Sequence, residues 1–376
     1  MANMKRTLAA SALLALSLTA CQPSSGGSAQ TIKLGYLGPL TGDAVGLGVD
    51  TLNGVKLAVE KVNAAGGING KQIEIVAEDG KCSGSESAHA AQKLVNVDKV
   101  VAIVGGQCSG ETLAAAPIAM AGKIVILSPV SSSPDVTKAG DFVFRDYPSD
   151  ELKTTAMKKL FADMNWKKVA IISENTDFAQ GFRKSLKEKL GNDAIAFDEV
   201  VDPDTKDFRS LLSRLKNTQF DVFFPDGNSD STIGPMLQQF KEAGFKQPAV
   251  SHDAADSATM AKNLPDATDG LYVINVPSST KDSSFESTFK QKYGDAQYGT
   301  AFAGYAYDAA NVLFEAFKSV GTDGPAVRDY LYQVSQYNGV SGNFHFDKNG
   351  DVLGIPYVLK QFKQGTITTV KDISVD

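Results

Sequence analysis

Strands and helices alternate along most of this chain in a pattern that few folds accommodate. Ile32–Leu37 predicts a buried strand and Val100–Val104 is a continuous apolar run, and between them Leu52, Val55 and Val59 recur at helical spacing. The same alternation continues to about residue 250. Continuous apolar runs suit parallel strands that helices cover on both faces. We therefore expect an α/β fold with parallel sheets, in which ligands bind at the carboxyl ends of the strands.

The last hundred residues depart from this pattern. Phe302–Val320 predicts a long, mostly apolar helix, and Phe344–Phe346 and Leu353–Leu359 predict two strands around the segment Asp347–Asp351. Such an acidic segment could suggest calcium, but a calcium loop needs its glycine at the sixth position. The spacing favours a hairpin turn instead.

The N-terminus carries a signal for export. Lys5 and Arg6 precede the apolar stretch Leu8–Leu18, which is too short to span a bilayer, and Cys21 follows directly after small residues. The segment resembles the bacterial lipobox, in which cleavage falls before the cysteine and the cysteine is acylated. An ordinary signal peptide with an incidental cysteine is the alternative. We predict a lipoprotein signal peptide at residues 1–20, a flexible tether at 21–31, and an extracytoplasmic protein that lipid on Cys21 anchors to a membrane.

Charge and length narrow the class of protein. The chain has 376 residues and a net charge of −6, and removal of Lys5 and Arg6 with the signal peptide leaves −8. A mildly acidic chain without a basic cluster is a poor candidate for binding nucleic acid. The mature length of about 350 residues exceeds what one hydrophobic core usually supports, so we expect two domains.

Two cysteines remain once Cys21 is assigned to lipid. Cys82 and Cys108 are an even pair, and in an oxidising compartment a disulfide between them is the default expectation. In the chain-entropy model such a bond stabilises the fold by roughly 3 kcal/mol.

The segment Gly106–Gly110, between a predicted strand and a predicted helix, has two interpretations. Cys108 could be the nucleophile of an elbow in a cysteine-dependent hydrolase, which needs a free thiolate and a histidine base. However, His252 and His345 have no flanking catalytic motif. In the other interpretation the Ser109 hydroxyl and the amides of the helix start face a ligand anion, with a plain N-cap role for Ser109 as the alternative. The residues favour binding, so we expect no catalysis, no metal and no cofactor.

The next predicted strand ends in the serine-rich segment Ser128–Pro134. Hydroxyls and carbonyls at the carboxyl end of a parallel strand can receive an ammonium group and support a carboxylate. A Ser/Pro loop without a ligand is the alternative. Two hydroxyl-rich strand ends in succession favour a binding cleft.

Several motifs carry a resemblance that covers almost the whole mature chain. They are Leu37–Gly42, Asn63–Gly70, Cys108-Ser109 followed by Ser128–Pro134, Lys206–Phe208 and Ala243-Gly244. The chain resembles the periplasmic binding proteins for leucine, isoleucine and valine, the branched-chain amino-acid branch of the type I solute-binding proteins.

This resemblance implies two Rossmann-like lobes joined by three chain crossings that form a hinge. Lobe 1 would comprise residues 32–147 and 277–354, and lobe 2 residues 148–276 and 355–376. The crossings would lie near Asp146–Ser149, Asn275–Ser278 and Ile355. The resemblance also implies the Cys82–Cys108 disulfide, closure of the hinge on a small-molecule ligand, and delivery of that ligand to the transmembrane permease subunits of an ABC importer.

The ligand positions of the family carry over one at a time. Ser109 matches the serine that binds the ligand carboxylate, and Val130 matches a position that acts through its carbonyl. Ser132 matches a hydroxyl usually supplied by threonine, which we expect to support the carboxylate. Asp253 matches the acid that pairs with the α-ammonium, with a helix N-cap as its alternative role.

The walls of the predicted pocket depart from the family. Leu47 occupies a place where an aromatic residue is common, and Phe178 stands where a tyrosine usually closes over the ligand. Phe302 matches an aromatic residue that packs against the ligand, although it could equally be a core residue of its helix. Asn228 lies in a segment that is longer and more polar than in the family. Leucine specificity therefore does not follow, and we predict capture of a branched-chain or other α-amino acid. A sensor for amides, urea or small carboxylates with the same fold is the alternative.

Overall fold

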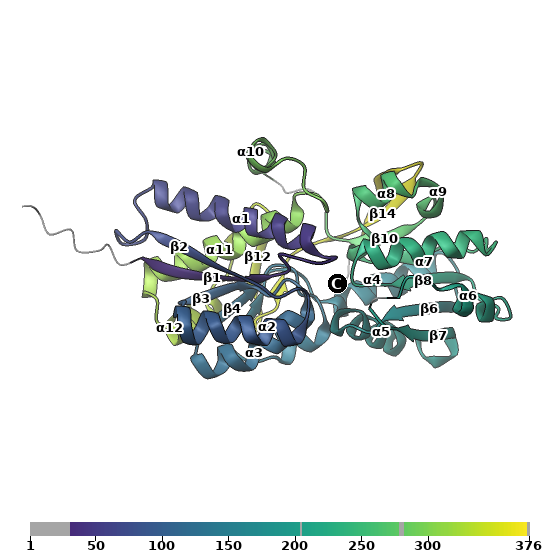
Figure 1. The fold of residues 1–376 in the computed structure, drawn as a ribbon, viewed down its shortest axis with the longest axis horizontal. Coiled ribbons are helices and arrows are strands. Elements are labelled where there is room, and N and C mark those ends of the chain that lie inside the picture. The colour runs from purple at the N-terminus through teal and green to yellow at the C-terminus, as the bar shows by residue number, and fades with distance from the viewer. Residues whose placement is uncertain (1–30, 204, 278–281, 374–376) are drawn as a thin grey trace, which may run out of the picture.

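The computed structural model describes residues 31–203, 205–277 and 282–373, which form two lobes side by side (Figure 1). The predicted signal peptide, Cys21 and all but the last residue of the predicted tether lie outside the described residues. Among the described helices, none is long and apolar enough to cross a membrane.

Lobe 1 is built on a five-stranded parallel sheet in the order β2-β1-β3-β4-β5, with helices on both faces (Figure 1). Its strands β3 and β4 are buried along their whole length, as expected for strands covered on both sides. The elements before the first crossing are β1 (Ile32–Gly38), α1 (Val45–Ala64), β2 (Ile73–Asp79), α2 (Gly84–Gln92), the π-helical turn η1 (Lys93–Asp98), β3 (Ala102–Gly105), α3 (Ser109–Gly122), β4 (Val125–Ser128), the 3₁₀ turn η2 (Pro134–Lys138) and β5 (Val143–Arg145). After the second crossing lobe 1 adds α10 (Ser283–Tyr293), α11 (Ala301–Val320), α12 (Gly324–Tyr332), β11 (Tyr337–Asn338), β12 (Asn343–Phe346) and β13 (Val352–Leu353).

Lobe 2 contains two smaller sheets, in the orders β7-β6-β8 and β15-β14-β10-β9, which an isolated bridge between Phe223 and Ala249 connects. Its elements are α4 (Asp150–Asp163), β6 (Val169–Glu174), α5 (Asp177–Leu190), η3 (Asn192–Ala194), β7 (Ile195–Val201), α6 (Arg209–Leu215), β8 (Val222–Asp226), α7 (Asp230–Glu242), β9 (Val250–Ser251), the 3₁₀ turn η4 (Asp253–Ala255), α8 (Ala258–Asn263), α9 (Pro265–Thr268), β10 (Tyr272–Asn275), β14 (Tyr357–Lys363) and β15 (Thr366–Ile373). The predicted α/β class with two Rossmann-like lobes is confirmed.

The C-terminal region differs from the sequence expectation. The turn at Asp347–Asp351 is confirmed, because Asp347 Oδ1 accepts the backbone N–H groups of Asn349 and Asp351 at 2.8 and 2.9 Å. The single strand predicted at Leu353–Leu359 is wrong. The chain turns at Gly354, whose φ of +100° favours glycine, so that β13 stays in lobe 1 and β14 begins in lobe 2. There β14 runs antiparallel to β10 and β15, which makes this sheet mixed.

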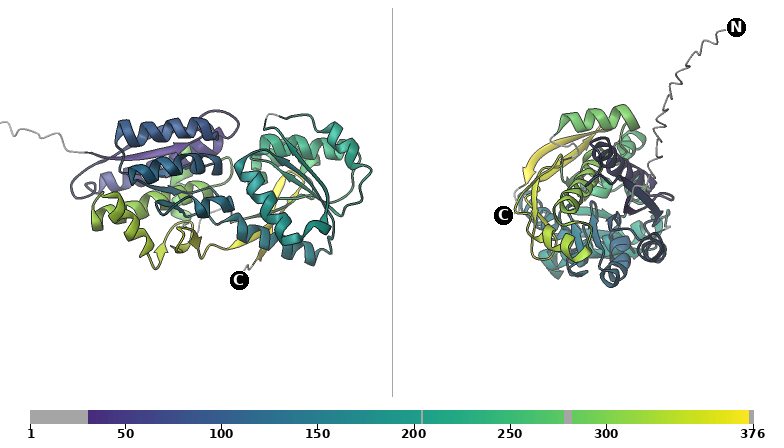
Figure 2. Two further views of the ribbon diagram at one scale, coloured as in Figure 1. Left: turned by 90° about the horizontal axis from the view of Figure 1, so that it is seen from below. Right: turned by 90° about the vertical axis from the view of Figure 1, so that its left-hand side faces the viewer.

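Residues 146–149 and 354–356 connect the lobes and lie between the two bodies in Figures 1 and 2, and a third connection joins β10 to α10, with residues 278–281 outside the described part of the chain. Side chains tie them together. Tyr147 Oη lies 2.8 Å from Asn275 Oδ1, and Tyr357 Oη donates to the Ser149 carbonyl at 3.0 Å. The predicted end of the second crossing at Ser278 lies outside the described residues, and the predicted lobe boundaries stay a prediction.

Candidate ligand-binding site

One cavity between the lobes brings together all eight residues predicted to contact a ligand. Lobe 1 contributes Leu47, Ser109, Val130, Ser132 and Phe302, and lobe 2 contributes Phe178, Asn228 and Asp253. The sequence prediction missed six further lining residues: Ala44, Gln107, Cys108, Ser229, Ala254 and Tyr298. Gln107 and Cys108 adjoin Ser109 in sequence, whereas Tyr298 belongs to no motif that could have revealed it.

The lobe 1 wall of the cavity is the start of α3 and the loop after β4. Cys108 occupies the N-cap position of α3, so the plain N-cap role considered for Ser109 is wrong. Ser109 Oγ accepts the Ser133 N–H at 3.2 Å, which leaves the Ser109 hydroxyl proton available to a ligand. No hydrogen bond within the described part of the chain occupies the Val130 carbonyl. Ser109 can therefore donate to a ligand, and Val130 can accept.

The predicted disulfide between Cys82 and Cys108 is confirmed, with 5.3 Å between the Cα atoms. It joins the loop after β2 to the first residue before α3. Beneath it, the buried Glu111 carboxylate accepts the N–H groups of Gln107 and Cys108 at 2.8 and 3.0 Å, and burial raises the pKa of Glu111 to about 7. Because Cys108 is bonded, it lacks the free thiolate that the cysteine-hydrolase interpretation requires.

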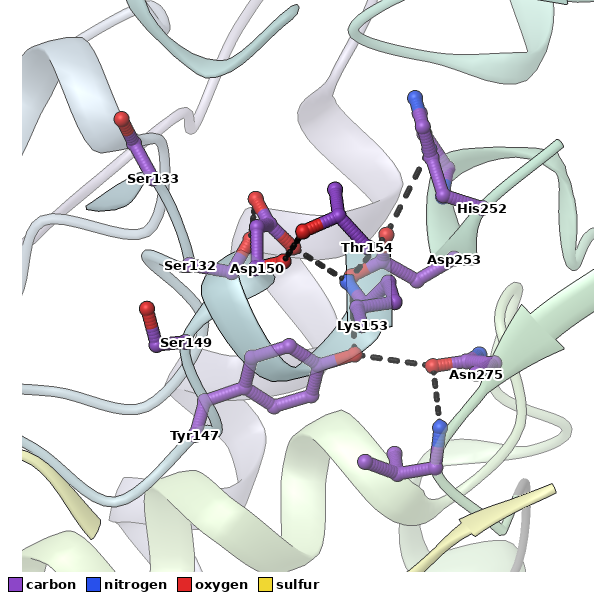
Figure 3. Close-up of polar contacts among 12 residues, drawn as sticks. Ser132, Ser133, Tyr147, Ser149, Asp150, Lys153, Thr154, His252, Asp253 and Asn275 are labelled. Carbon is purple, nitrogen blue, oxygen red and sulfur yellow. Dashed lines mark hydrogen bonds and ion pairs between the residues drawn. The ribbon is translucent and has the colours of Figure 1, made fainter. Parts of the chain in front are cut away.

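Asp253, on the lobe 2 side, belongs to a buried cluster of charged residues (Figure 3). Lys153 Nζ forms ion pairs with Asp253 Oδ1 at 2.9 Å and with Asp150 Oδ1 at 2.7 Å. Tyr147 Oη donates to Asp253 Oδ2 at 2.8 Å. Burial alone would raise the pKa of Asp253, but the charges of Lys153 and His252 outweigh burial and hold it below its ordinary value. The cluster thus keeps Asp253 ionised beside the cavity.

The alternative role of Asp253 as a helix N-cap is wrong. Asp253 opens the 3₁₀ turn η4, and the residue that caps the following helix α8 is Ser257, whose Oγ accepts the Met260 N–H at 3.1 Å. The Asp253 side chain points instead toward Lys153 and Tyr147 (Figure 3).

Ser132 has a partner that the sequence did not predict. Its hydroxyl donates to Asp150 Oδ2 at 2.9 Å (Figure 3). A serine hydroxyl has one proton and two acceptor lone pairs. While the Ser132 hydroxyl donates to Asp150, Ser132 can offer a ligand only an acceptor, which differs from the expected role of supporting the carboxylate.

His252 is part of the same cluster and is not placed as a catalytic base. Its Nε2 lies 2.9 Å from Asp226 Oδ1 and its Nδ1 lies 3.5 Å from Asp253 Oδ1. Burial alone would lower the pKa of His252, but these two carboxylates raise it to about 9. The ring is fully enclosed and packs edge-on against Phe178 with 4.8 Å between ring centroids. Lys153 and His252 show no sequence pattern that distinguishes them from ordinary surface residues.

The remaining walls combine apolar and polar side chains from both lobes. Phe178 and Phe302 are buried, and Leu47 is half-buried. Tyr298 Oη donates across the cleft to Asp230 Oδ1 at 3.2 Å, and Asn228 Nδ2 donates to Cys82 Sγ at 3.1 Å. The two lobes are therefore in contact around the cavity. In the described part of the chain, no cluster of His, Cys, Asp and Glu side chains is arranged to hold a metal.

A family model described as "Periplasmic binding protein" matches residues 31–366. The chain belongs to the periplasmic binding protein family. The leucine-, isoleucine-, valine-, threonine- and alanine-binding protein of Pseudomonas aeruginosa is 28% identical to it over 355 residues, which is 92% of this chain and 93% of the relative.

Solved structures agree with this membership. A leucine-binding protein from Thermotoga maritima superposes with a TM-score of 0.83 at 25% identity, covering 92% of this chain and 99% of the other. A branched-chain amino acid transporter substrate-binding protein from Streptococcus pneumoniae, solved in complex with isoleucine, gives 0.82 at 26% identity with the same coverage. The predicted resemblance is confirmed at the level of the family.

Proposed function

We propose that this protein captures an α-amino acid in the cavity between its lobes and delivers it to an ABC importer. The observation that carries the proposal is that the cavity lining holds both hydrogen-bond acceptors and a hydrogen-bond donor. Asp253, the Val130 carbonyl and the Ser132 oxygen are acceptors, and the Ser109 hydroxyl is a donor. An α-amino acid presents an ammonium group with three protons beside a carboxylate. The acceptors of the cavity complement the ammonium group, and the donor complements the carboxylate.

The ammonium group would meet one charged and two neutral acceptors. Asp253 supplies the charge, and a charge-assisted hydrogen bond in a site shielded from water is stronger than a neutral one. The carboxylate would meet the Ser109 hydroxyl at the start of α3, where the helix dipole favours a negative group. Phe178, Phe302 and Leu47 would then surround the ligand side chain.

Closure of the lobes would complete the site. Asp43 of lobe 1 accepts hydrogen bonds from Ser231 and Lys206 of lobe 2, at 2.9 and 3.3 Å. A ligand that contacts both lobes favours the closed state by its difference in affinity for the two states. The amino-acid ligands in the names of the relatives described above support the same ligand class.

A thermal-shift screen tests the ligand class. The panel contains the proteinogenic L-amino acids, together with urea, acetamide, acetate and benzoate. Because a bound ligand stabilises the folded state by mass action, at least one amino acid should raise the melting temperature in a concentration-dependent way. A shift produced only by benzoate, urea, acetamide or acetate would replace the amino-acid proposal with the alternative ligand class.

We also propose that Cys21 carries the lipid that holds the protein at an extracytoplasmic membrane surface. Mass spectrometry of the protein from a bacterial membrane fraction should show an acylated N-terminal cysteine after removal of residues 1–20. The Cys21→Ser variant should lose the lipid and appear in the soluble fraction. An unmodified Cys21 in a protein cleaved elsewhere would contradict this part of the proposal.

A further inference from the structure

The ion triad Asp150–Lys153–Asp253 lies directly behind the ligand cavity. Asp150 and Lys153 stand on the first turn of α4, next to the first crossing, and their side chains are fully buried. Asp253 is 5% exposed and is the only one of the three that lines the cavity. With both carboxylates ionised and the lysine protonated, the triad carries one net negative charge, and Asp253 is its member that lines the cavity. Figure 3 shows the three side chains together.

Lys153 is the reason that both carboxylates can stay charged. Without a cation between them, two buried carboxylates that face one another share a proton, and at least one becomes neutral. The burial of Lys153 alone would lower its pKa, but Asp150 and Asp253 outweigh burial and raise it, so the lysine stays protonated. His252 and Tyr147 also contact Asp253, and the Tyr357 hydroxyl interacts with it electrostatically.

Asp150, the second partner of Lys153, also contacts Ser132, which lines the cavity. Ser132 donates its only hydroxyl proton to Asp150 Oδ2 at 2.9 Å, and the Asp150 backbone N–H donates to the Ser132 carbonyl at 2.7 Å. Burial raises the pKa of Asp150 above its ordinary value, and the Lys153 ammonium 2.7 Å away opposes that rise. In its ionised form Asp150 accepts but cannot donate. The Ser132 oxygen is therefore held as an acceptor toward the cavity.

We propose that Lys153 is a positioning residue that makes this site selective for a protonated amine. By pairing with Asp150 and Asp253 together, it keeps Asp253 ionised and fixes Ser132 as an acceptor, so that a ligand with an ammonium group binds more tightly than the same ligand with a hydroxyl in its place. This inference rests on the proposed function, and it adds a specificity determinant that does not touch the ligand.

Lys153 could also have the opposite effect on selectivity, and that effect is the result that would contradict the inference. If the internal ammonium of Lys153 fully satisfied Asp253, the site would not discriminate an amine from a hydroxyl. The second lone pairs of Asp253 Oδ2 and Ser132 Oγ, together with the net charge of the triad, favour amine selectivity.

Calorimetric titration with three matched pairs of ligands tests the inference: L-alanine and L-lactate, L-leucine and L-2-hydroxy-4-methylpentanoate, and L-phenylalanine and L-3-phenyllactate. In the wild type, the amine member of each pair that binds should be preferred by roughly 10- to 100-fold. The Lys153→Met variant removes the cation and leaves both carboxylates, so that Asp150 and Asp253 share a proton. It should reduce the preference to about threefold or less.

Lys360→Met is the matched control. Lys360 is also buried and also pairs with an aspartate, Asp256, but it lies outside the cavity. This variant should retain the wild-type amine preference. Equal binding of amine and hydroxyl members by the wild type, or an unchanged preference in Lys153→Met, overturns the inference.

A measurement without ligand separates this inference from the proposed function. In a ¹³C NMR titration of the ligand-free protein, the Asp253 carboxyl should titrate below the ordinary range in the wild type, and markedly higher in Lys153→Met. If no pair binds the wild type, the amino-acid proposal and the amine selectivity fail, and the titration still decides whether Lys153 holds Asp253 ionised. An unshifted Asp253 in a folded variant overturns the positioning role.

Discussion

Asp253 shows how much the environment of a single side chain decides. A buried aspartate without partners would take up a proton, yet here Lys153, His252 and Tyr147 surround it with a cation, an imidazole and a hydroxyl donor. The charge that a ligand meets is therefore set by residues that the ligand does not touch.

Asp253→Asn should weaken binding of an amino-acid ligand by about 2 kcal/mol or more, because it removes the charge-assisted part of the ammonium contact. Isothermal titration calorimetry measures the change. Asp198→Asn is the matched control, since Asp198 pairs with Arg183 and Lys187 away from the cavity. Equal affinity of Asp253→Asn and the wild type for the amino acid would show that the ammonium subsite lies elsewhere.

His252 should make stability depend on pH. Its pKa in the folded protein is about 9, above the value of roughly 6.5 in an unfolded chain. A raised pKa contributes stability that is fully present below about pH 6.5 and is lost as the pH rises toward 9. The difference in the free energy of unfolding between the wild type and His252→Gln should therefore shrink over that window by an amount on the order of 3 kcal/mol.

Denaturant unfolding of both proteins at several pH values measures this difference. Subtracting the free energy of unfolding of His252→Gln from that of the wild type removes the contribution of Glu111, which both proteins share. The raised pKa of Glu111, about 7, also makes stability fall as the pH rises, but at lower pH than His252 does. A difference that stays constant from pH 6.5 to 9 would mean that His252 is neutral in the folded protein.

At the scale of elements, the start of α3 is held by a covalent bond as well as by hydrogen bonds. The Cys82–Cys108 bond closes a loop of 26 residues, for which the chain-entropy model gives about 3.5 kcal/mol of stabilisation. Cys82→Ser/Cys108→Ser should lower the free energy of unfolding by about this amount. The double variant should also lower the affinity for the amino-acid ligand, because Ser109 follows the disulfide-bonded Cys108 directly in the sequence. Wild-type stability and affinity in the double variant would contradict both expectations.

The elements also show which parts of the structure the sequence could predict. Strands such as β3, which are apolar throughout, and long amphipathic helices such as α11 were predictable because their residues carry the pattern of burial. The strand β15 was not, because most of its residues are exposed and no apolar face marks it. For the cavity, the motifs and the family resemblance located eight of the residues that line it. Lys153 could not be found in this way, because its partner Asp253 is a hundred residues away in sequence.

At the scale of the whole molecule, the contacts of Asp43 bridge the two lobes. Asp43→Ala removes the hydrogen bonds that Asp43 accepts from Ser231 and Lys206. The variant should bind the amino-acid ligand about two- to fivefold more weakly, because exposed pairs contribute roughly 0.2–1 kcal/mol. Glu60→Ala is the control, because its exposed pair with Lys292 lies within lobe 1. Small-angle scattering and calorimetry together measure closure and affinity. An equal effect of the two variants would show that the Asp43 contacts do not stabilise closure.

The central claim is that the inter-lobe cavity receives the ammonium group of an amino acid at Asp253 and its carboxylate at Ser109. The most direct measurement is a crystal structure of the protein with the amino acid that gives the largest thermal shift. The ligand nitrogen should lie within hydrogen-bond distance of Asp253, the Val130 carbonyl and Ser132, with the carboxylate at Ser109. A ligand whose carboxylate faces Asp253 and Lys153, or one bound outside this cavity, would contradict the claim.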